Sequence, residues 1–368
     1  MERFGFVGLP NAGKSSLYNA LTGSHALAAP YPFATKDPNI GVARVPDPRL
    51  DALAAMSSSA KVVPATVEVV DIGGLVEGAS KGEGLGNKFL ANIREVDAIV
   101  FVLRAFADDD IPGPSDPLEH LRVVELELAL ADLETVEARL SRVQKAARLG
   151  KGDAAVAEEA AALERAQAHL GAGRPLYRAG ISDDDRAVLA PHFLLTTRRV
   201  LAVVNVAEDD LAGIPAQVAR VRAELAPPGS ASEREVEVLG MSVQLEAEAA
   251  QLAPGDRAEM LEALGLGEGA LPRLVRSAYH LLGLRTFLTT GDKESRAWTF
   301  RAGSTAPECA GRIHTDLQRG FIRADVIGCE ELLAIGSWTR ARELGKVRVE
   351  GKDYLVADGD VLEIRFNV

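Results

Sequence analysis

A glycine-rich segment near the start of the sequence contains the residue types needed to bind phosphate. Residues 8–15 read GLPNAGKS and match the pattern G-x-x-x-x-G-K-[ST] at every fixed position. The two glycines let the backbone curl so that successive N–H groups face the β-phosphate of a nucleotide. Lys14 would then reach the β- and γ-phosphates, and the Ser15 hydroxyl would bind Mg²⁺. The nucleotide contacts predicted here are Asn11, Ala12, Gly13, Lys14, Ser15 and Ser16.

Two further segments place polar groups where the metal and the terminal phosphate are expected. Asp71 follows a β-branched run at 66–70, and ligands of open α/β sheets gather at the carboxyl ends of strands. There Asp71 suits the outer shell of Mg²⁺, and the Gly74 N–H suits the γ-phosphate. Thr35 is an ordinary loop residue by type, but it lies where a switch threonine would meet the metal. The predicted metal-site residues are Ser15, Thr35 and Asp71, and the predicted catalytic residues are Lys14, Thr35 and Gly74.

The elements that must position these groups alternate between strands and helices over the first 105 residues. The apolar segment 4–7 indicates a short buried strand, and 14–21 indicates the helix that follows it. The run 98–103 is almost entirely apolar, as in a parallel sheet covered on both faces, and 200–204 has the same character. We therefore predict an α/β fold whose sheet is interrupted between these two strands.

The interruption has the pattern of two long helices. Residues 118–149 contain no Pro or Gly, and their apolar residues recur at spacings of three and four; a second stripe runs from Val156 to Leu170. Gly150, Gly152 and Asp153 indicate a short turn and a helix cap between them. These features predict an antiparallel, coiled-coil-like arm, with a bundle that only covers the core as the alternative.

Basic residues gather near the predicted tip of this arm. They recur every three residues and therefore wind around the helix instead of forming one face. A solvated surface and a patch that contacts RNA or acidic groups are both consistent with this spacing. The residues are Arg139, Arg142, Lys145, Arg148 and Lys151.

The C-terminal segment differs in character from the rest. A helical stretch at 256–282 is followed by predicted strands at 297–300, 346–349 and 361–366 around a helix near 307–318. Residues 284–368 contain 13 Lys and Arg and 13 Asp and Glu, so this segment is neutral while the remainder carries the whole net charge of −12. We interpret it as a small, separate α+β domain.

Composition narrows the function classes. The 41 Lys and Arg against 53 Asp and Glu argue against a general nucleic-acid backbone binder, so no DNA partner is expected. Two cysteines form neither a disulfide framework nor a tetrahedral metal site, and a structural or solvated role is expected for each of the six histidines. The N-terminus lacks a signal-type apolar region and no apolar run could span a bilayer, so we predict a cytoplasmic protein without membrane association.

Taken together, these segments resemble the translation-factor-related GTPases and, among them, the Obg-like ATPases (the YchF family). The resemblance covers nearly the whole chain and implies a Mg²⁺-dependent ATPase, with ATP as substrate, that associates with the large ribosomal subunit or the whole ribosome. It also implies a P-loop G domain at 1–117 and 199–283, an inserted coiled-coil arm at 118–198, and a β-grasp (TGS) domain at 284–368. The segments that carry it are 8–16, 31–35, 71–87, 296–299, 313–316 and 320–323.

The segment after the 200–204 strand bears on the choice of base. GTPases recognise guanine with Asn-Lys-x-Asp, and here Asn205, Val206 and Glu208 are similar to the Asn-x-x-Glu variant of the Obg-like ATPases. Asn205 is expected to bond the N7 edge of the purine, and backbone groups near Val206 to pair with adenine. Ser242 resembles the loop that lies under the base. Losing the aspartate removes the main preference for guanine, which predicts that ATP is preferred to GTP.

At two positions the residue differs from the one expected in ordinary GTPases or in the resembled family. Leu75 stands where ordinary GTPases have a water-orienting glutamine, and Phe101 stands where the resembled family often has a histidine. Neither side chain can orient water or move a proton. The favoured hypothesis is a slow ATPase whose nucleotide state switches a partner interaction. The alternatives are a ribosome-binding module with a structural nucleotide, and a GTPase.

Overall fold

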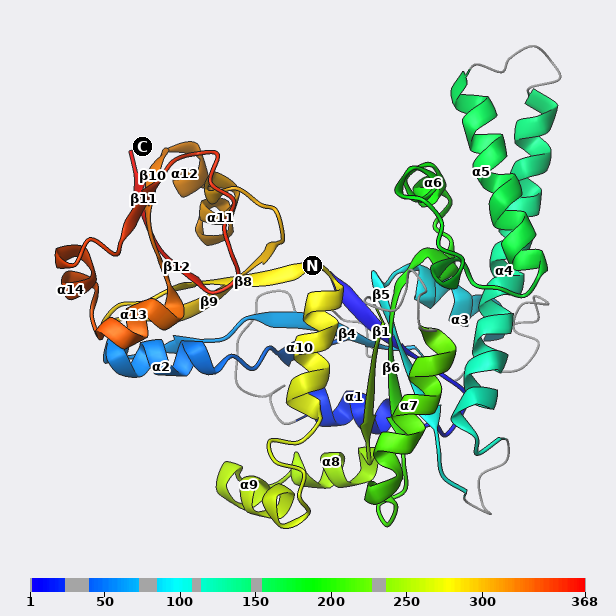
Figure 1. Ribbon diagram of the computed structural model, residues 1–368, viewed down its shortest axis with the longest axis horizontal. Helices are drawn as coiled ribbons and strands as arrows, with labels where there is room; N and C mark the ends of the chain where they lie inside the picture. The colour runs from blue at the N-terminus through cyan, green and yellow to red at the C-terminus, as the bar shows by residue number, and fades with distance from the viewer. Residues whose placement is uncertain are drawn as a thin grey trace. The chain divides into compact units, whose positions relative to one another are not determined.

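The computed structural model describes residues 2–23, 40–72, 85–107, 114–146, 154–226 and 236–367 (Figure 1). The predicted site residues Thr35 and Gly74, together with Leu75, Arg148 and Lys151, lie outside these ranges. The chain divides into two compact units, one formed by residues 1–42 and 68–274 and the other by 43–67 and 275–368.

A six-stranded sheet forms the centre of the first unit. Its strand order is β2-β4-β1-β5-β6-β7, and the pairs from β4 to β7 are parallel. The predicted strands and their sheet are therefore present. Their bounds are β1 (Arg3–Val7), β2 (Ile40–Arg44), β4 (Thr66–Asp71), β5 (Ala98–Arg104), β6 (Arg199–Asn205) and β7 (Glu237–Met241).

The register of this sheet brings the predicted polar residues to one edge. Asp71 of β4 lies beside Phe6 of β1, and Arg104 of β5 lies beside Asn205 of β6. β1 ends beside Phe101 of β5, one residue before the GLPNAGKS segment begins. Because all four strands run in the same direction, their carboxyl ends together form the edge where an α/β sheet binds ligands.

Helices cover the sheet and bury its apolar side chains. α3, α4 and α7 contribute residues such as Ile93, Leu121 and Val221 to one core cluster with sheet residues such as Ile99 and Val204. The helices of this unit outside the arm are α1 (Lys14–Thr22), α3 (Leu85–Arg94), α7 (Ile214–Leu225), α8 (Val243–Ala249) and α9 (Pro254–Ala263), with the 3₁₀ helices η5 (Leu195–Thr197) and η6 (Leu211–Gly213).

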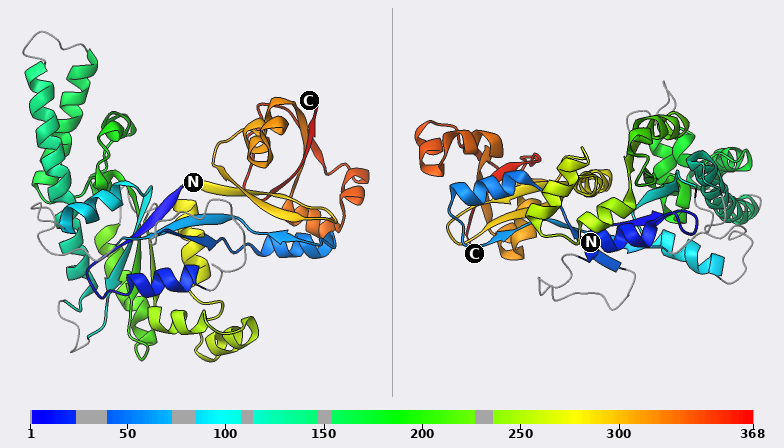
Figure 2. Two further views of the ribbon diagram at one scale, coloured as in Figure 1. Left: turned by 180° about the vertical axis from the view of Figure 1, so that it is seen from behind. Right: turned by 90° about the horizontal axis from the view of Figure 1, so that it is seen from below.

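The predicted arm is a pair of helices, α4 (Pro117–Ala146) and α5 (Ala154–Gly171), that lie side by side (Figures 1 and 2). Leu140 and Val143 of α4 pack with Leu163 and Leu170 of α5 in a second core cluster, which confirms the stripe of α5 and the later part of the stripe of α4. The prediction that the α4 stripe also contains Leu126 and Leu130 is wrong, because these side chains are 49% and 39% exposed. The return to the sheet runs through η3 (Leu176–Arg178), α6 (Asp183–Leu189) and η4 (Ala190–His192).

Buried polar contacts join the base of the arm to its return segment. The Asp132 carboxylate, 1% exposed, accepts hydrogen bonds from the backbone N–H groups of Leu195 and Thr196 at 2.8 and 2.7 Å. Glu125 accepts from Tyr177 and pairs with Arg178. Burial raises the pKa of Glu125, while the neighbouring Arg178 opposes that shift. These contacts hold the arm in a defined orientation relative to its return segment.

The second unit contains its own six-stranded sheet, in the order β11-β10-β12-β8-β9-β3. The strands are β3 (Val62–Val63), β8 (Leu284–Thr289), β9 (Ser295–Arg301), β10 (Phe321–Gly328), β11 (Arg348–Glu350) and β12 (Asp360–Phe366). The helices are α2 (Pro48–Met56), α11 (Ala306–Ile313), α12 (Thr315–Arg319), α13 (Cys329–Ile335) and α14 (Trp338–Glu343), and α10 (Leu271–Leu281) spans the boundary between units.

Several elements of the C-terminal half differ from the prediction. The expected helix at 256–282 is two helices, α9 and α10, because Gly265, Gly267 and Gly269 between them adopt positive φ angles of 69°, 58° and 82°. The helix near 307–318 is also two, since His314 is extended, with φ −161°. Strands β8 and β10 were not predicted. β10 contains Arg and Asp, which obscure its apolar alternation.

Residues 43–67 belong to the second unit although they are far from it in sequence. β3 pairs in parallel with β9, and Arg49 of α2 forms an ion pair with Asp358 at 3.0 Å. This long-range pairing was not part of the predicted domain ranges. Among the described helices, none is long and apolar enough to cross a membrane.

Candidate nucleotide-binding site

The loop between β1 and α1 has the geometry of a phosphate-binding loop. Asn11 and Gly13 adopt left-handed conformations, with φ of 59° and 100°. A side chain at Gly8 would place its Cβ 2.4 Å from the Val102 carbonyl oxygen of β5, so only glycine fits there. α1 begins at Lys14 without a side-chain cap, which leaves its first N–H groups free for an anion. Ser15 and Ser16 are exposed at this end, and Ala12 is buried.

Lys14 is buried in this loop. Its Nζ donates a hydrogen bond to the Leu9 carbonyl oxygen at 2.7 Å, and the residue is only 5% exposed. Burial lowers the pKa of Lys14 to about 8, and the nearby negative charge of Asp71 partly opposes this shift. The ammonium group is thus poorly solvated before any nucleotide binds, and phosphate oxygens would supply the negative charge that it lacks.

Asp71 is suited to a metal ion. It ends β4 and is partly buried, and its Oδ1 is buried without a hydrogen-bond partner in the described part of the chain. A buried carboxylate oxygen normally has a partner, and a hydrated Mg²⁺ would provide one. No cluster of three acidic, His or Cys residues occurs in the described ranges.

Asn205 connects three parts of the site. Its Nδ2 donates to the Ala12 carbonyl oxygen at 3.0 Å, and its Oδ1 accepts from the Val243 N–H at the start of α8, also at 3.0 Å. The residue is 5% exposed, and a Cβ at Gly13 would lie 2.7 Å from its Nδ2. Asn205 therefore holds the phosphate loop against β6 and α8. We expected it to face the base, but these contacts leave only the second amide hydrogen for that purpose.

The other three predicted base contacts differ in burial and in their hydrogen bonds. Val206 is 2% exposed and its N–H donates to the Met241 carbonyl oxygen at 2.9 Å, so this N–H is not available to adenine. Glu208 is exposed to solvent. Ser242 is 3% exposed, and its Oγ has no hydrogen-bond partner among the described residues. Ser242 is thus a buried hydroxyl that is free to meet a ligand.

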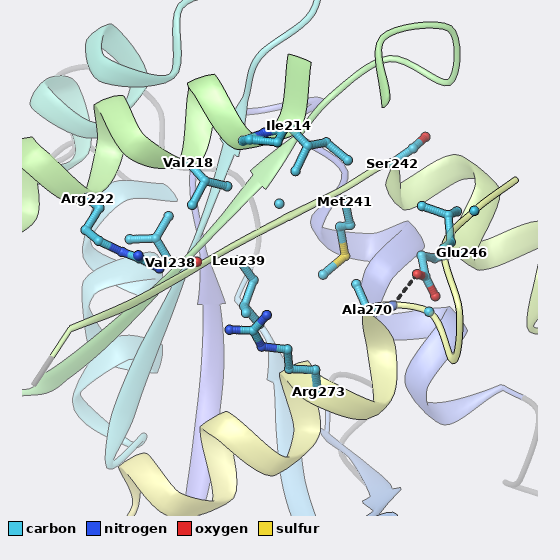
Figure 3. Close-up of a pocket in the computed structure, with 15 residues that line it drawn as sticks. Ile214, Val218, Arg222, Val238, Leu239, Met241, Ser242, Glu246, Ala270 and Arg273 are labelled. Carbon is cyan, nitrogen blue, oxygen red and sulfur yellow. Dashed lines mark hydrogen bonds between the residues drawn. The ribbon is translucent and has the colours of Figure 1, made fainter. Parts of the chain in front are cut away.

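A cavity of about 370 Å³ lies beside β7 (Figure 3). Ile214 and Val218 of α7 line it on one side of the strand, and Ala270 and Arg273 line it on the other. Of the predicted base contacts, only Ser242 borders this cavity. No residue of the phosphate loop lines this cavity, so the cavity is separate from the loop.

Two buried polar residues, at the end of β5 and at the start of α4, are not among the predicted site residues. Arg104, at the end of β5, is 2% exposed, and its Nε donates to the Phe106 carbonyl oxygen at 3.1 Å. His120, in the first turn of α4, is also 2% exposed. An arginine at the carboxyl end of an apolar strand is visible in the sequence, and it indicates a residue at the edge of the sheet where ligands bind. Phe101 is fully buried in β5, 6.3 Å from the Tyr177 ring, which is consistent with a core role.

The parallel sheet, the loop with its buried lysine and the carboxylate at the end of β4 together define the class of P-loop nucleoside triphosphatases. Two family models agree. Residues 3–138 match a model described as "50S ribosome-binding GTPase". Residues 284–367 match the C-terminal YchF GTPase model, which is described as a protein of unknown function.

Full-length relatives make the assignment more specific. The chain is 45% identical to proteins named "Ribosome-binding ATPase YchF" from Bacillus subtilis and Escherichia coli O157:H7, with 99% of each chain covered. It is 36% identical to "Obg-like ATPase 1" from Pongo abelii over 99% of this chain and 92% of that protein. The solved Schizosaccharomyces pombe YchF GTPase superposes with a TM-score of 0.86 at 32% identity, covering 99% and 97% of the two chains. The chain belongs to the YchF family of P-loop ATPases, as the sequence motifs predicted.

Proposed function

We propose that this protein is a Mg²⁺-dependent ATPase that prefers ATP to GTP and whose nucleotide state switches an interaction with the ribosome. The observation that supports the base preference is the segment after β6. The residue that would accept two hydrogen bonds from guanine is replaced by Glu208, which is exposed, and the usual lysine is replaced by the buried Val206.

The proposed preference for ATP depends on which buried polar groups would be left unpaired by each base. A site built to recognise guanine discriminates by several kcal/mol, because its buried polar groups go unpaired with another base. Here no buried aspartate follows Asn205, so adenine meets no such penalty. Ser242, with its free buried hydroxyl, is the group we assign to the loop under the base.

The proposed chemistry uses the residues at the sheet edge. Ser15 and Thr35 would bind Mg²⁺ and Asp71 would hold its water shell, while Lys14 and the Gly74 N–H would stabilise charge on the β- and γ-phosphates. Asn11, Ala12, Gly13 and Ser16 complete the phosphate contacts. With Leu75 in place of a polar residue, hydrolysis without a partner is slow.

The support for a ribosomal partner comes from the relatives, which are named ribosome-binding ATPases. We assign the contact to the arm, 118–198, and to the neutral TGS domain, 284–368. The G domain is then 1–117 and 199–283 without residues 43–67 and 275–283, which belong to the second unit. On the arm, Arg142 and Lys145 are exposed, whereas Arg139 already pairs with Glu159 at 2.7 Å. A ribosomal partner would place the protein in the cytoplasm, and neither a membrane nor DNA is part of the proposal.

Competition binding tests the base preference. Labelled ATP should be displaced by unlabelled ATP at a lower concentration than by GTP, and the reverse order would establish the GTPase alternative. The variant Val206→Lys/Glu208→Asp restores the guanine-reading residue types and should shift the preference toward GTP, with Glu208→Asp alone as its control.

Turnover tests the other alternative. Phosphate release should be measurable with Mg²⁺ and should change when purified ribosomes are added. Ribosome binding without any phosphate release would instead support a binding module in which the nucleotide is structural.

A further inference from the structure

The cavity beside β7 has no part in the function proposed above. β7 is the last strand in the order of the first sheet, so one of its edges pairs with no strand in the described part of the chain. The cavity of about 370 Å³ lies along this strand, and all the residues that line it fall between 214 and 273, within the first unit. Its volume lies in the range of ligand pockets, about 300–1,000 Å³.

The backbone of β7 offers hydrogen-bonding groups at this edge. In a parallel pair, successive residues direct their N–H and C=O groups alternately toward the partner strand and away from it. The Met241 carbonyl oxygen accepts a hydrogen bond from the Val206 N–H, directly after β6, at 2.9 Å. The polar groups of the preceding residue, Gly240, therefore face the open edge, where Gly240 lines the cavity. Free groups on an edge strand are a template for another extended chain.

Apolar side chains form the walls of the cavity. Ile214 and Val218 of α7 are only half-buried although they are apolar, and Leu239 and Leu266 line the same space. A ligand with apolar side chains would remove this surface from water, which favours binding.

A buried carboxylate lies toward one end of the cavity. Figure 3 shows Glu246 toward the end of β7 at Met241. Glu246 is 2% exposed, and its Oε1 accepts a hydrogen bond from the Ala270 N–H, while its Oε2 is buried without a partner among the described residues. Burial raises the pKa of Glu246, and a bound cation would offset this cost of the buried charge. An ammonium group would supply both the missing donor and the positive charge.

Two arginines lie toward the other end of the cavity, near Val238 (Figure 3). Arg273 already pairs with Glu237 at 2.9 Å. Arg222 is exposed and forms no ion pair with any described residue, and its Nη2 donates to the Val238 carbonyl oxygen at a long 3.4 Å. Arg222 is therefore the guanidinium that can pair with a carboxylate of a ligand.

We infer that this cavity binds a short apolar peptide with free ends, extended along the edge of β7 in the antiparallel direction. Its ammonium group would meet Glu246 and its carboxylate would meet Arg222. The direction follows from the charges, because β7 runs from Val238 toward Met241 and Glu246. At about 3.4 Å per residue, a tripeptide matches the three strand residues 238–240. Complementary charges at both ends favour a free peptide over a strand inside a partner protein.

Titration calorimetry with the tripeptide Leu-Val-Leu tests this inference, with its N-acetylated form and its C-terminal amide as matched ligands. The free tripeptide should bind saturably. Acetylation should weaken binding at least about tenfold, because it removes a charged hydrogen bond to a buried group. Amidation should weaken it only about threefold, because Arg222 is exposed. No saturable binding of the free peptide at millimolar concentration, or equal affinity of the free and acetylated forms, would refute the inference. Unchanged affinity of the amide would assign the cavity to the N-terminus of a protein instead.

Two variants of the full chain separate recognition from folding. Glu246→Gln keeps an acceptor for the Ala270 N–H but loses the charge, so it should weaken the free peptide about tenfold and leave the acetylated peptide unchanged. Arg222→Gln should weaken the free peptide and not the amide, with Arg220→Gln, an exposed arginine of the same helix outside the cavity, as its control. Equal weakening of all three peptides in folded Glu246→Gln would show a structural role alone and overturn the inference.

The amide resonance of Gly240 reports where the peptide lies. In ¹⁵N–¹H spectra of the full chain, the free tripeptide should shift this resonance, because the Gly240 N–H faces the open edge of β7. Saturable binding that leaves Gly240 unshifted would place the peptide elsewhere and refute the inference. These measurements need no nucleotide, so their result is independent of the proposed ATPase function.

Discussion

Nucleotide binding should take up a proton from solution at pH 8. In the free protein, burial lowers the pKa of Lys14 to about 8, so about half of its side chains are neutral at pH 8 and about a tenth at pH 7. Bound phosphate oxygens favour the charged form and raise this pKa. Each binding event should therefore take up about half a proton at pH 8, and affinity should fall by up to about tenfold per unit at higher pH.

Isothermal titration calorimetry measures this proton uptake directly, when the same titration is repeated in buffers of different ionisation enthalpy. The matched control is Lys14→Arg, because a guanidinium stays charged throughout this pH range and has no proton to gain. Wild-type binding at pH 8 without proton uptake would refute the assigned state of Lys14. Equal proton uptake in the arginine variant would show that a group other than Lys14 takes up the proton.

Three further predictions follow from the site and the arm. Asn205→Ala leaves the Ala12 carbonyl and the Val243 N–H unpaired, and should lower the free energy of unfolding by about 2–4 kcal/mol in urea titrations, whereas the exposed Glu208→Ala should change it by less than about 0.5 kcal/mol. Lys14→Ala should abolish phosphate release and Leu75→Ala should change it modestly; an equal collapse in both would reveal a direct role for Leu75. Ribosome cosedimentation should weaken with salt and on charge reversal of three arm residues, and an unchanged result would remove the arm from the contact. Those residues, each changed to Glu, are Arg142, Lys145 and Arg148.

The parts of the fold that sequence reading predicted are those encoded within a few residues. The run of buried residues in β5 and the apolar stripes of α4 and α5 are local patterns, and they form the elements expected of them. The phosphate loop is local as well, because a few consecutive backbone N–H groups and one lysine provide its chemistry. The structure adds the reason for Gly8, which is its close approach to Val102 of a distant strand.

Elements that depend on long-range pairing were missed. β10 carries Arg323 and Asp325 and becomes a strand because it pairs with both β11 and β12. The pairing of β3 with β9 brings residues 43–67 to the C-terminal unit, and no local signal in the sequence encodes that pairing. The segment between α9 and α10 shows the opposite case, since its three glycines are a local signal for a helix break that the sequence itself contains.

The sequence by itself determined the class of chemistry, because the phosphate-binding residues are contiguous and their types specify what they bind. Tertiary structure decided which distant side chains join them. Asn205 meets the phosphate loop only because β6 ends beside it, and its amide is then used by Ala12 and Val243. Burial, which lowers the pKa of Lys14, depends on the packing of several elements and is not encoded in any one segment of the chain.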